Sequence, residues 1–511
     1  MLRQVGNMKA RSIGIFLQYL NTALSMACGL FLSAFLVRVL GDTEYGLYQT
    51  ICSFVNYLVL LEFGTGTVIA RNIAASRAEN DKEKIQKNVS TIWAITCILV
   101  VVILIVSMIF YRFLGTIYSK TLTVEQIQYG RKIFLTVLGF LIASFYTNTL
   151  NGVLLGFERY ELQPIVTTIR LITRTVFLVI AVLVFRKSIV IACVDLIIAT
   201  AVDVFLIVYC HRNFEIKFHF KEFDWCVFKN SLPLATAIFI QVLINQANNS
   251  VDKFVIGVKL GPEEVTVYSV GLFVYGVFSS MTTIPISMYA PQVVKTITCG
   301  HSPDEVSRQL VQPSRLIVLI GGTVLFGFFA VGRQFVTIVY GVSYVLAWEV
   351  ALIIMTPMLI NMSNGILVNI LNATNKRLAR SGILLITTIA NIVLTVLWID
   401  KYGVLGACVA TAVCTILGQI LLMDLYYNKA LHINIILFKL NTFRGIALYQ
   451  IIAGGIAFFI GRYITNVIVS FFVGGFAYVS LFSGLFWLFG ASSDEKGIVI
   501  RLFHRVRHRK Q

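Results

Sequence analysis

The feature that most constrains this chain is a series of long hydrophobic stretches without any charged residue, such as 93–110 and 467–489. A bilayer core about 30 Å thick needs roughly 20 apolar residues per helix, and both stretches lie in the range that membrane helices use. Of the 511 residues, 58% are hydrophobic and only 13% are charged. Charged residues make up about a quarter of an ordinary soluble domain. We therefore predict an all-α polytopic membrane protein.

The hydrophobic stretches predict about fourteen transmembrane helices. The first follows the basic residues Arg3, Lys9 and Arg11. It is too long for the apolar core of a signal peptide, which has about 7–15 residues, so we predict that it is retained as a helix. The predicted spans are 13–38, 45–70, 89–111, 132–153, 164–185, 189–210, 232–257, 265–290, 313–332, 346–371, 381–399, 403–427, 445–465 and 467–489.

The basic residues are distributed unevenly between the two sides of these spans. Most of the 42 Lys and Arg residues fall in segments that share a side with both termini. The positive-inside rule therefore predicts that both termini are cytoplasmic. The basic tail RLFHRVRHRK, residues 501–510, then lies near anionic headgroups. A net charge of +18 is explained in this way, without nucleic acid as a partner.

A short motif occurs twice, as LGDTEYGLY at 40–48 and as LGPEEVTVY at 260–268. Gly41 and Gly261 suit the left-handed conformation that often ends a helix, so the motif is typical of a hairpin between two spans. The repeat predicts two parallel six-helix copies with two helices appended, an arrangement found in transporters. The predicted parts are an N-terminal six-helix bundle (1–210), a cytoplasmic interfacial linker (211–231), a C-terminal six-helix bundle (232–427), two additional transmembrane helices (428–490) and a basic cytoplasmic tail (491–511).

The first hairpin resembles the L-G-P-E-E-Y-G-x-Y hairpin of bacterial polysaccharide and O-antigen flippases. These proteins belong to the multidrug/oligosaccharidyl-lipid/polysaccharide exporter superfamily. The resemblance extends to LEFGTGTVIARNIA (61–74), to NNSVDKFVIGVKLGPEEVTVYS (248–269) and to the predicted layout of about fourteen spans. It implies a protein that moves undecaprenyl-diphosphate-linked sugar units from the cytoplasmic to the outer leaflet.

Two arginines lie inside the fifth predicted span. Arg170 and Arg174 are four residues apart and so share a helix face. A planar guanidinium can donate two hydrogen bonds to a phosphate, which makes both residues candidates for binding a lipid diphosphate. Asp195 and Asp203 in the next span offer another interpretation, in which an internal Arg–Asp pair satisfies the charges. The sequence leaves both interpretations open.

Amide side chains form the second group of candidates. In the seventh predicted span, Gln241, Asn245 and Asn249 lie on one helix face, and the tenth predicted span adds Asn361 and Asn364. Such a polar face avoids lipid, so it lines either a cavity or another helix. Amides suit the hydroxyl groups of sugars, although hydrogen bonding between helices explains them nearly as well.

Four acidic residues inside the spans are candidates for coupling transport to a proton or a sodium ion: Glu62, Asp195, Asp203 and Asp252. Charges are costly in the membrane, so intramembrane acids are functional candidates by default. None of the nine cysteines forms a C-x-x-C pair, and the six histidines lie outside the predicted spans. We therefore predict neither a metal site nor another cofactor.

The predicted function is a flippase for undecaprenyl-diphosphate-linked oligosaccharides that works by alternating access in surface polysaccharide biosynthesis, such as that of O-antigen. The alternatives are a multidrug cation antiporter or a lipid II flippase of the same superfamily. The segments outside the spans are short and contain no phosphate-binding P-loop, so we predict no enzymatic activity. The expected location is the bacterial inner membrane. The expected partners are the lipid-linked substrate, membrane lipids and the polysaccharide polymerase machinery.

Overall fold

The computed structural model describes residues 2–217, 222–298, 303–374, 376–491 and 496. All secondary structure within these residues is helical, and no strand occurs among them. The chain divides into two compact units, Met1–Thr266 and Val267–Gln511, called unit 1 and unit 2. The predicted all-α class is confirmed.

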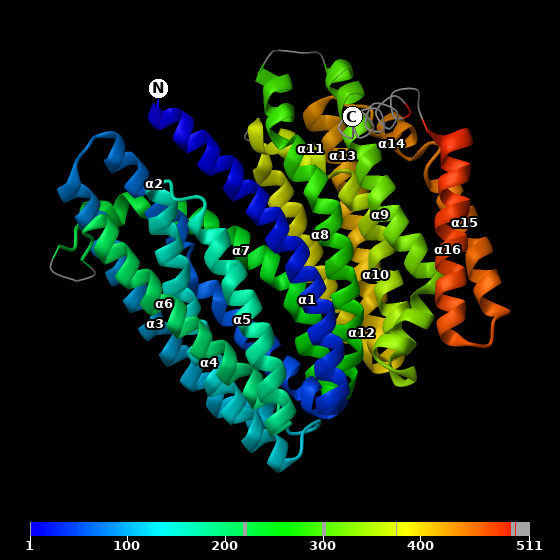
Figure 1. Cartoon of the computed structure of the whole chain (residues 1–511), viewed down its shortest axis with the longest axis horizontal. Coiled ribbons are helices and arrows are strands. Elements are labelled where there is room, and N and C mark those ends of the chain that lie inside the picture. Colours follow the sequence, from blue (N-terminus) through cyan, green and yellow to red (C-terminus); the bar gives the residue numbers. More distant parts are fainter. Residues whose placement is uncertain (1, 218–221, 299–302, 375, 492–495, 497–511) are drawn as a thin grey trace, which may run out of the picture. The chain divides into compact units, whose positions relative to one another are not determined.

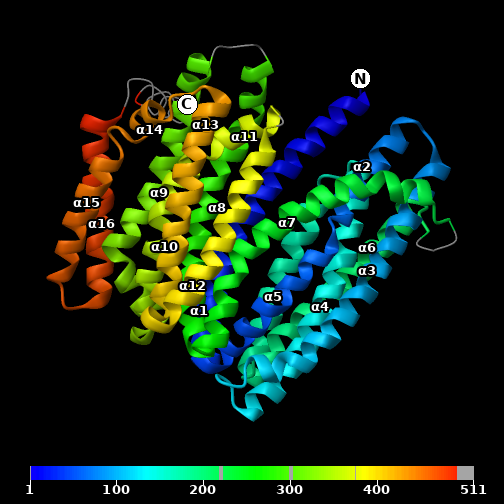
Figure 2. The same ribbon diagram turned by 180° about the vertical axis from the view of Figure 1, so that it is seen from behind.

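The described residues of unit 1 form seven complete α-helices and one 3-10 segment (Figure 1, blue to green): α1 (Leu2–Val55), η1 (Asn56–Glu62), α2 (Thr65–Ala78), α3 (Lys82–Ile117), α4 (Val124–Gly156), α5 (Leu162–Phe185), α6 (Ile189–Phe214) and α7 (Trp225–Lys259). Within this unit α4 packs against α2, α3 and α6. Figure 2 shows α3, α4 and α6 from the opposite side, again running next to one another.

Unit 2 begins inside α8 (Pro262–Thr298) and continues to the C-terminus. Its other elements are α9 (Pro303–Val339), η2 (Val342–Tyr344), α10 (Leu346–Ser363), α11 (Gly365–Ala373), α12 (Arg377–Cys414), η3 (Thr415–Leu422), α13 (Met423–Leu431), α14 (Ile435–Phe443), α15 (Ala447–Arg462), α16 (Val467–Leu485) and η4 (Phe486–Gly490). In this unit α9 contacts α10, α14, α15 and α16.

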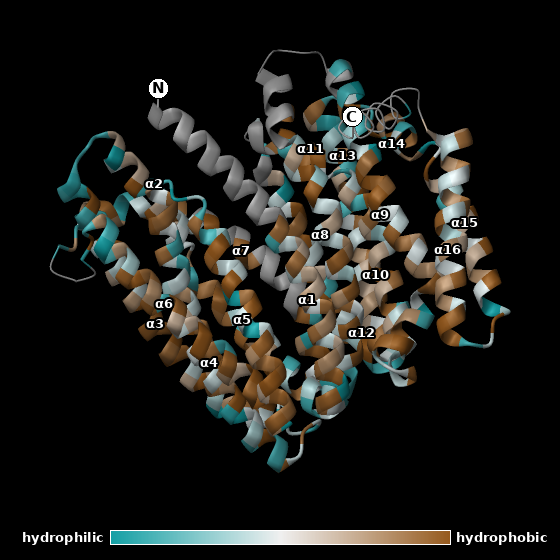
Figure 3. Ribbon diagram, in the orientation of Figure 1, coloured by the Kyte–Doolittle hydropathy of each residue, from teal (hydrophilic) through white to brown (hydrophobic). Residues whose placement is uncertain are grey.

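Ten helices of the described residues are long and apolar enough to cross a membrane, or eleven if the bent pair of α14 and α15 counts as one span. Two of the ten are 59 and 53 residues long. Each of these contains a glycine with non-helical backbone angles, Gly41 or Gly403, at which two helices join in a kink. Hydrophobic residues cover long faces of α3, α4 and α5 (Figure 3). The multi-pass membrane fold is confirmed, whereas the number of fourteen spans and the side of the termini stay predictions.

Helix α4 is the most buried candidate span, with 56% of its apolar window inside the protein. It begins with a capping box, in which the backbone N–H of Gln126 donates to Thr123 Oγ1 at 3.2 Å and the backbone N–H of Thr123 donates to Gln126 Oε1 at 2.9 Å. Gly152 lets α2 approach closely, since a Cβ at this position would lie 2.1 Å from the Gly66 carbonyl oxygen. Small residues allow such close contacts between membrane helices.

Helix α7 packs within unit 1. The rings of Phe63 and Phe239 stack with their centroids 4.5 Å apart, and Phe254 of α7 stacks on Phe54 of α1 at 5.8 Å. The helix begins at Trp225, earlier than the predicted span, and Asp224 caps it by accepting a hydrogen bond from the backbone N–H of Cys226 at 2.7 Å. The predicted boundaries of the two bundles and the linker stay predictions.

Each of the two hairpin motifs contains a glycine with a positive φ. Gly41 has a φ of +80° and Gly261 a φ of +101°, values that residues with a side chain rarely adopt. Glu44 in the first hairpin accepts hydrogen bonds from the backbone N–H of Ser188 at 3.1 Å and from its hydroxyl at 2.7 Å. This carboxylate therefore ties the first hairpin to the start of α6.

Within unit 1 the two hairpins also contact each other. Thr43 Oγ1 donates to Glu263 Oε1 at 3.3 Å, and Thr266 Oγ1 donates to the carbonyl oxygen of Asp42 at 2.8 Å. Gly46 faces Pro262 so closely that a Cβ would lie 1.9 Å from the proline carbonyl oxygen. Asp42 and Pro262 are equivalent positions of the repeated motif, and so are Gly46 and Thr266. The Thr266–Asp42 contact and the Gly46–Pro262 contact therefore join the same two motif positions, with the two hairpins exchanged. A local two-fold relation between the hairpins produces such a pairing.

Candidate functional site

An ion pair joins α5 and α6 in unit 1. Arg174 donates from Nε to Asp195 Oδ1 and from Nη2 to Asp195 Oδ2, the latter at 3.0 Å. Two parallel hydrogen bonds from a planar guanidinium to one carboxylate make the strongest and most directional kind of ion pair. The Asp195 side chain is 7% exposed, whereas that of Arg174 is 33% exposed. The carboxylate is therefore buried, while part of the Arg174 side chain stays accessible.

Arg170 and Asp203, on the same two helices, each contact a side chain of α4. The guanidinium carbon of Arg170 lies 5.7 Å from the centroid of the Phe140 ring, a cation–π contact. Asp203 is buried and accepts a short hydrogen bond from Thr147 Oγ1. The sequence left open whether an internal Arg–Asp pair forms, and the structure contains one between Arg174 and Asp195.

Glu62 is the last residue of η1, which interrupts the continuous helix predicted over 45–70. Phe63 and Gly64 follow it with left-handed backbone angles, φ +51° and φ +65°. The side chain of Asn148 on α4 lies within hydrogen-bonding reach of the Glu62 carboxylate. A 3-10 break within a helix often marks a hinge or a functional position. Glu62 remains a candidate for ion coupling, now at a break between two helices.

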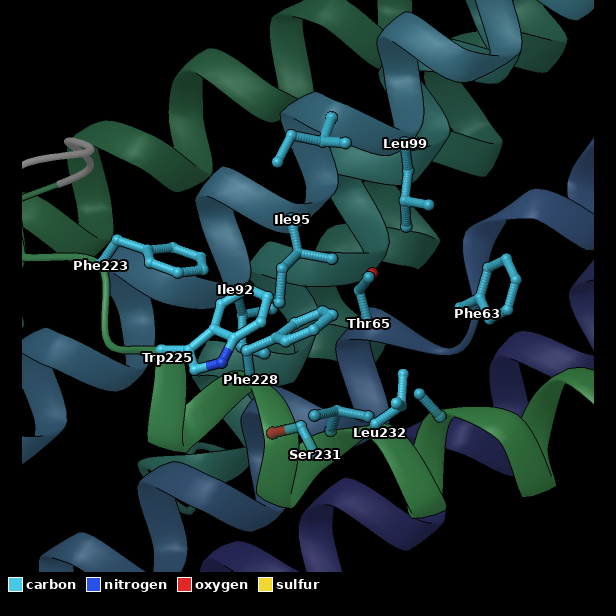
Figure 4. A pocket seen from close by; sticks show the side chains of 13 residues that line it. Phe63, Thr65, Ile92, Ile95, Leu99, Phe223, Trp225, Phe228, Ser231 and Leu232 are labelled. Carbon is cyan, nitrogen blue, oxygen red and sulfur yellow. The ribbon is translucent and has the colours of Figure 1, made fainter.

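An apolar pocket of about 350 Å³ opens in unit 1 beside this break and is called the aromatic pocket (Figure 4). The rings of Trp225 and Phe228, at the start of α7, face Ile95 of α3. Thr65 also lines the pocket, and its hydroxyl lies 3.0 Å from that of Thr149. The sequence analysis missed this pocket because threonine and aromatic residues do not stand out in a hydrophobic span.

Only the backbone of α7 is described where the predicted amide stripe lies. The side chains of Gln241, Asn245 and Asn249 are outside the described part of the structure. The backbone there is helical, so the four-residue spacing places the three residues on one face, as predicted. Asp252 lies further along the same helix, and its side chain is buried.

The predicted asparagines of unit 2 form hydrogen bonds between helices. Asn361 Nδ2 donates to Gln419 Oε1 at 2.9 Å, and Asn364 Nδ2 donates to Asp424 Oδ1 at 3.1 Å. Lys439 forms an ion pair with the other carboxylate oxygen of Asp424. These contacts connect α10 with η3, α13 and α14, which is the structural interpretation that the sequence left open for the two asparagines.

Asp424 and Lys439 were missed by the sequence analysis. Asp424 lies within the predicted span 403–427, and an acidic residue inside a span is the signal that could have identified it. Lys439 lies between two predicted spans, where basic residues are ordinary. Only the folding of α14 after its cap residue Asn434 brings this lysine to the carboxylate.

The sequence matches the family model described as "Polysaccharide biosynthesis protein" over residues 14–297. The match covers more than half of the 511 residues. A comparison with proteins of curated function finds no match.

The structure resembles several solved membrane transporters. The lipid II flippase MurJ in an inward closed conformation aligns with a TM-score of 0.68 at 13% identity, over 93% of this chain and 98% of that chain. An inward-facing multidrug resistance MATE family transporter aligns with a TM-score of 0.61 at 13% identity, over 79% of this chain and 95% of that chain. A mutant of the Vibrio cholerae MATE transporter VcmN aligns at 0.54 and 15% identity, over 84% and 98%.

At these identities the similarity to solved structures concerns the fold alone, and the family follows from the sequence match. Both agree with the resemblance that the hairpin motif indicated. The chain belongs to the polysaccharide biosynthesis protein family and has the helical fold of flippases and transporters of the multidrug/oligosaccharidyl-lipid/polysaccharide exporter superfamily.

Proposed function

We propose that this protein moves undecaprenyl-diphosphate-linked oligosaccharides from the cytoplasmic to the outer leaflet of the bacterial plasma membrane by alternating access. The observation that carries the proposal is the partly accessible side chain of Arg174, whose guanidinium the buried carboxylate of Asp195 orients inside a membrane helix bundle. Membership of a polysaccharide biosynthesis family supports the oligosaccharide as cargo. The polymerase that consumes the flipped unit is the expected partner.

The diphosphate needs cationic groups that recognise phosphate oxygens. The bonds to Asp195 use two of the five N–H donors that a guanidinium carries, so Arg174 can hold its carboxylate and also approach an anion. Arg170 lies one turn away on α5, about 6 Å along the helix axis, and its contact with the Phe140 ring does not neutralise its charge. In this proposal each arginine approaches one phosphate of the diphosphate.

The sugar and the coupling ion are assigned to other residues. Gln241, Asn245 and Asn249 share one face of α7, and their amides match sugar hydroxyls. Asn361 and Asn364 already have partners within unit 2, so sugar binding there would require those hydrogen bonds to open. Glu62 and Asp252 are assigned to proton or sodium coupling, with Asp195 and Asp203 as the further acidic candidates.

The test uses full-length protein reconstituted in liposomes with a fluorescent undecaprenyl-diphosphate oligosaccharide. The fraction of label protected from a membrane-impermeant quencher is followed with time. We expect wild type to flip the lipid and Arg174→Ala to lose this activity. Arg131→Ala is the matched control, because Arg131 of the same unit also lies over an aromatic ring, 5.3 Å from the centroid of Tyr111. Size-exclusion chromatography and thermal unfolding confirm the folding of each variant.

Equal flipping by Arg174→Ala and wild type would remove the arginine from the substrate site and leave it a structural partner of Asp195. A folded wild type that flips no oligosaccharide but exports an organic cation would contradict the proposal and favour the cation antiporter. A fluorescent lipid II supplied in parallel separates the third candidate, since we expect it to cross more slowly than the oligosaccharide lipid.

A further inference from the structure

Unit 2 contains a second pocket, of about 720 Å³, which is called the arginine pocket. It is formed by the first turns of α9, the turn between α14 and α15, the start of α15 and the end of η4. Three arginines line it, Arg308, Arg315 and Arg444, and no acidic residue occurs among the described residues of its lining. The aromatic pocket of unit 1, in contrast, is lined by apolar residues, Thr65 and Ser231 in the part of the chain that the structure describes. The arginine pocket therefore favours an anionic ligand.

Arg315, which lines the arginine pocket, is held in place by hydrogen bonds to three backbone carbonyl oxygens. Its Nη1 donates to the carbonyl oxygens of Asn441 at 3.2 Å and Arg444 at 2.7 Å, and its Nη2 donates to that of Gly490 at 3.2 Å. These carbonyls lie where α14 and η4 end, so Arg315 joins two helix ends. That structural role accounts for Arg315, but it does not account for Arg308 and Arg444, whose side chains are exposed at the same pocket.

Part of the lining of the arginine pocket is apolar. Leu448 is 59% exposed and Phe489 is 69% exposed, and the rings of Tyr449 and Phe489 lie with their centroids 6.3 Å apart. Exposed leucine and phenylalanine side chains on membrane helices suit contact with hydrocarbon chains. The pocket thus joins cationic groups to an apolar surface, which matches a phosphate group attached to a lipid chain. Basic pockets between membrane helices on the cytoplasmic side are known to bind such headgroups.

We infer that the arginine pocket binds the headgroup phosphate of an anionic phospholipid through Arg308 and Arg444, with an acyl chain against Leu448 and Phe489. The positive-inside distribution predicts that this end of unit 2 is cytoplasmic, the side where anionic lipids give the membrane surface a negative potential. The lipid is a resident ligand rather than the transported substrate, so the inference does not depend on the proposed function.

The test places full-length protein in phosphatidylcholine nanodiscs that contain a trace of photoreactive phosphatidylglycerol. Cross-linked peptides are mapped by mass spectrometry. We expect labelling within 303–315 and 441–449, competed by unlabelled phosphatidylglycerol but not by phosphatidylcholine. The double variant Arg308→Gln/Arg444→Gln should reduce this labelling about tenfold, since each basic residue near an anionic surface strengthens binding. Arg315 is left intact because it joins helix ends.

The matched control is Arg333→Gln/Arg462→Gln, which removes exposed arginines from the opposite ends of α9 and α15. We expect it to retain wild-type labelling. Equal labelling in the two double variants would overturn the site. Displacement of the probe by inorganic phosphate as effectively as by phosphatidylglycerol would overturn the lipid assignment and indicate a site for a free anion. Wild-type labelling unaffected by unlabelled phosphatidylglycerol would overturn the inference without any variant.

Discussion

An ion pair joins two helices in each unit, between Arg174 and Asp195 in unit 1 and between Lys439 and Asp424 in unit 2, and the two pairs are built differently. In unit 1 the planar guanidinium of Arg174 donates two hydrogen bonds to Asp195, and the two side chains are unequally exposed, at 33% and 7%. In unit 2 the ammonium group of Lys439 meets Asp424, and both side chains are 19% exposed. Asn364 donates to the same carboxylate.

The difference indicates which pair can also meet a ligand. Asp424 accepts from both a lysine and an asparagine, so its pair links three helices and suits a structural role. Asp195 is buried, whereas the side chain of Arg174 stays partly accessible, so this pair leaves a cationic side chain available to a ligand. Four substitutions can break or sharpen this comparison.

The largest effect is expected from Asp195→Ala, which leaves the Arg174 guanidinium without its carboxylate. Breaking one side of a buried pair costs about 3 kcal/mol of the free energy of unfolding. The measurement is denaturant unfolding in detergent micelles. The companion variant Arg174→Met/Asp195→Leu should recover most of this stability, because an apolar pair can replace an ion pair, but it should not flip lipid. A companion variant that does flip lipid would contradict the role of Arg174.

Asp424→Ala is expected to cost less, about 1–2 kcal/mol, because Lys439 and Asn364 lose a partner but the lysine can extend to water. Flipping of the fluorescent lipid should stay close to the wild-type rate. If Asp424→Ala stops flipping while the protein remains folded, the contrast between a structural pair and a functional pair is wrong.

Arg174→Lys tests the geometry of the first pair at constant charge. A lysine lacks the planar fork that donates two hydrogen bonds at once, so we expect flipping to fall about tenfold. Stability should change less than in Asp195→Ala, since a cation remains beside the carboxylate. Retention of full flipping would show that charge alone is sufficient at this position.

The smallest effect is expected from Lys439→Arg, the reciprocal change in unit 2. If this pair only links helices, a second cation of similar length should support it, with a change in unfolding free energy of less than about 1 kcal/mol and an unchanged flipping rate. A loss of flipping in this variant would assign the second pair a role beyond stability.

The sequence alone predicted the membrane class and the positive φ of Gly41 and Gly261, because hydrophobic length and glycine chemistry are local properties. The family was indicated separately, by the resemblance of the hairpin motif. The sequence did not predict which arginine pairs with which aspartate. When residues are counted along the two antiparallel helices, at about 1.5 Å per residue, Arg170 and Asp203 lie at the same depth in the membrane. The ion pair nevertheless forms between Arg174 and Asp195. The depth of a residue along the helix axis does not include the length of its side chain or the rotation of the helix about its axis. Both of these determine which side chains meet.

Interruptions within predicted spans were also beyond the sequence. The segment 45–70 is hydrophobic throughout most of its length, but the structure changes to a 3-10 helix over Asn56–Glu62 and then turns through Phe63 and Gly64. Hydropathy predicts that a segment lies in the membrane and cannot predict that its helix is broken there. The break places Glu62 beside Asn148, a contact that depends on α4 packing against α2.

The packing of α7 and of the second hairpin has a consequence for the synthesis of the chain. In the predicted repeat these segments open the second copy, yet they complete unit 1 through Phe239 and Glu263. A ribosome must therefore translate beyond the first copy before the first unit can close. A gene divided at 211–231 would separate α7 from the helices on which it packs.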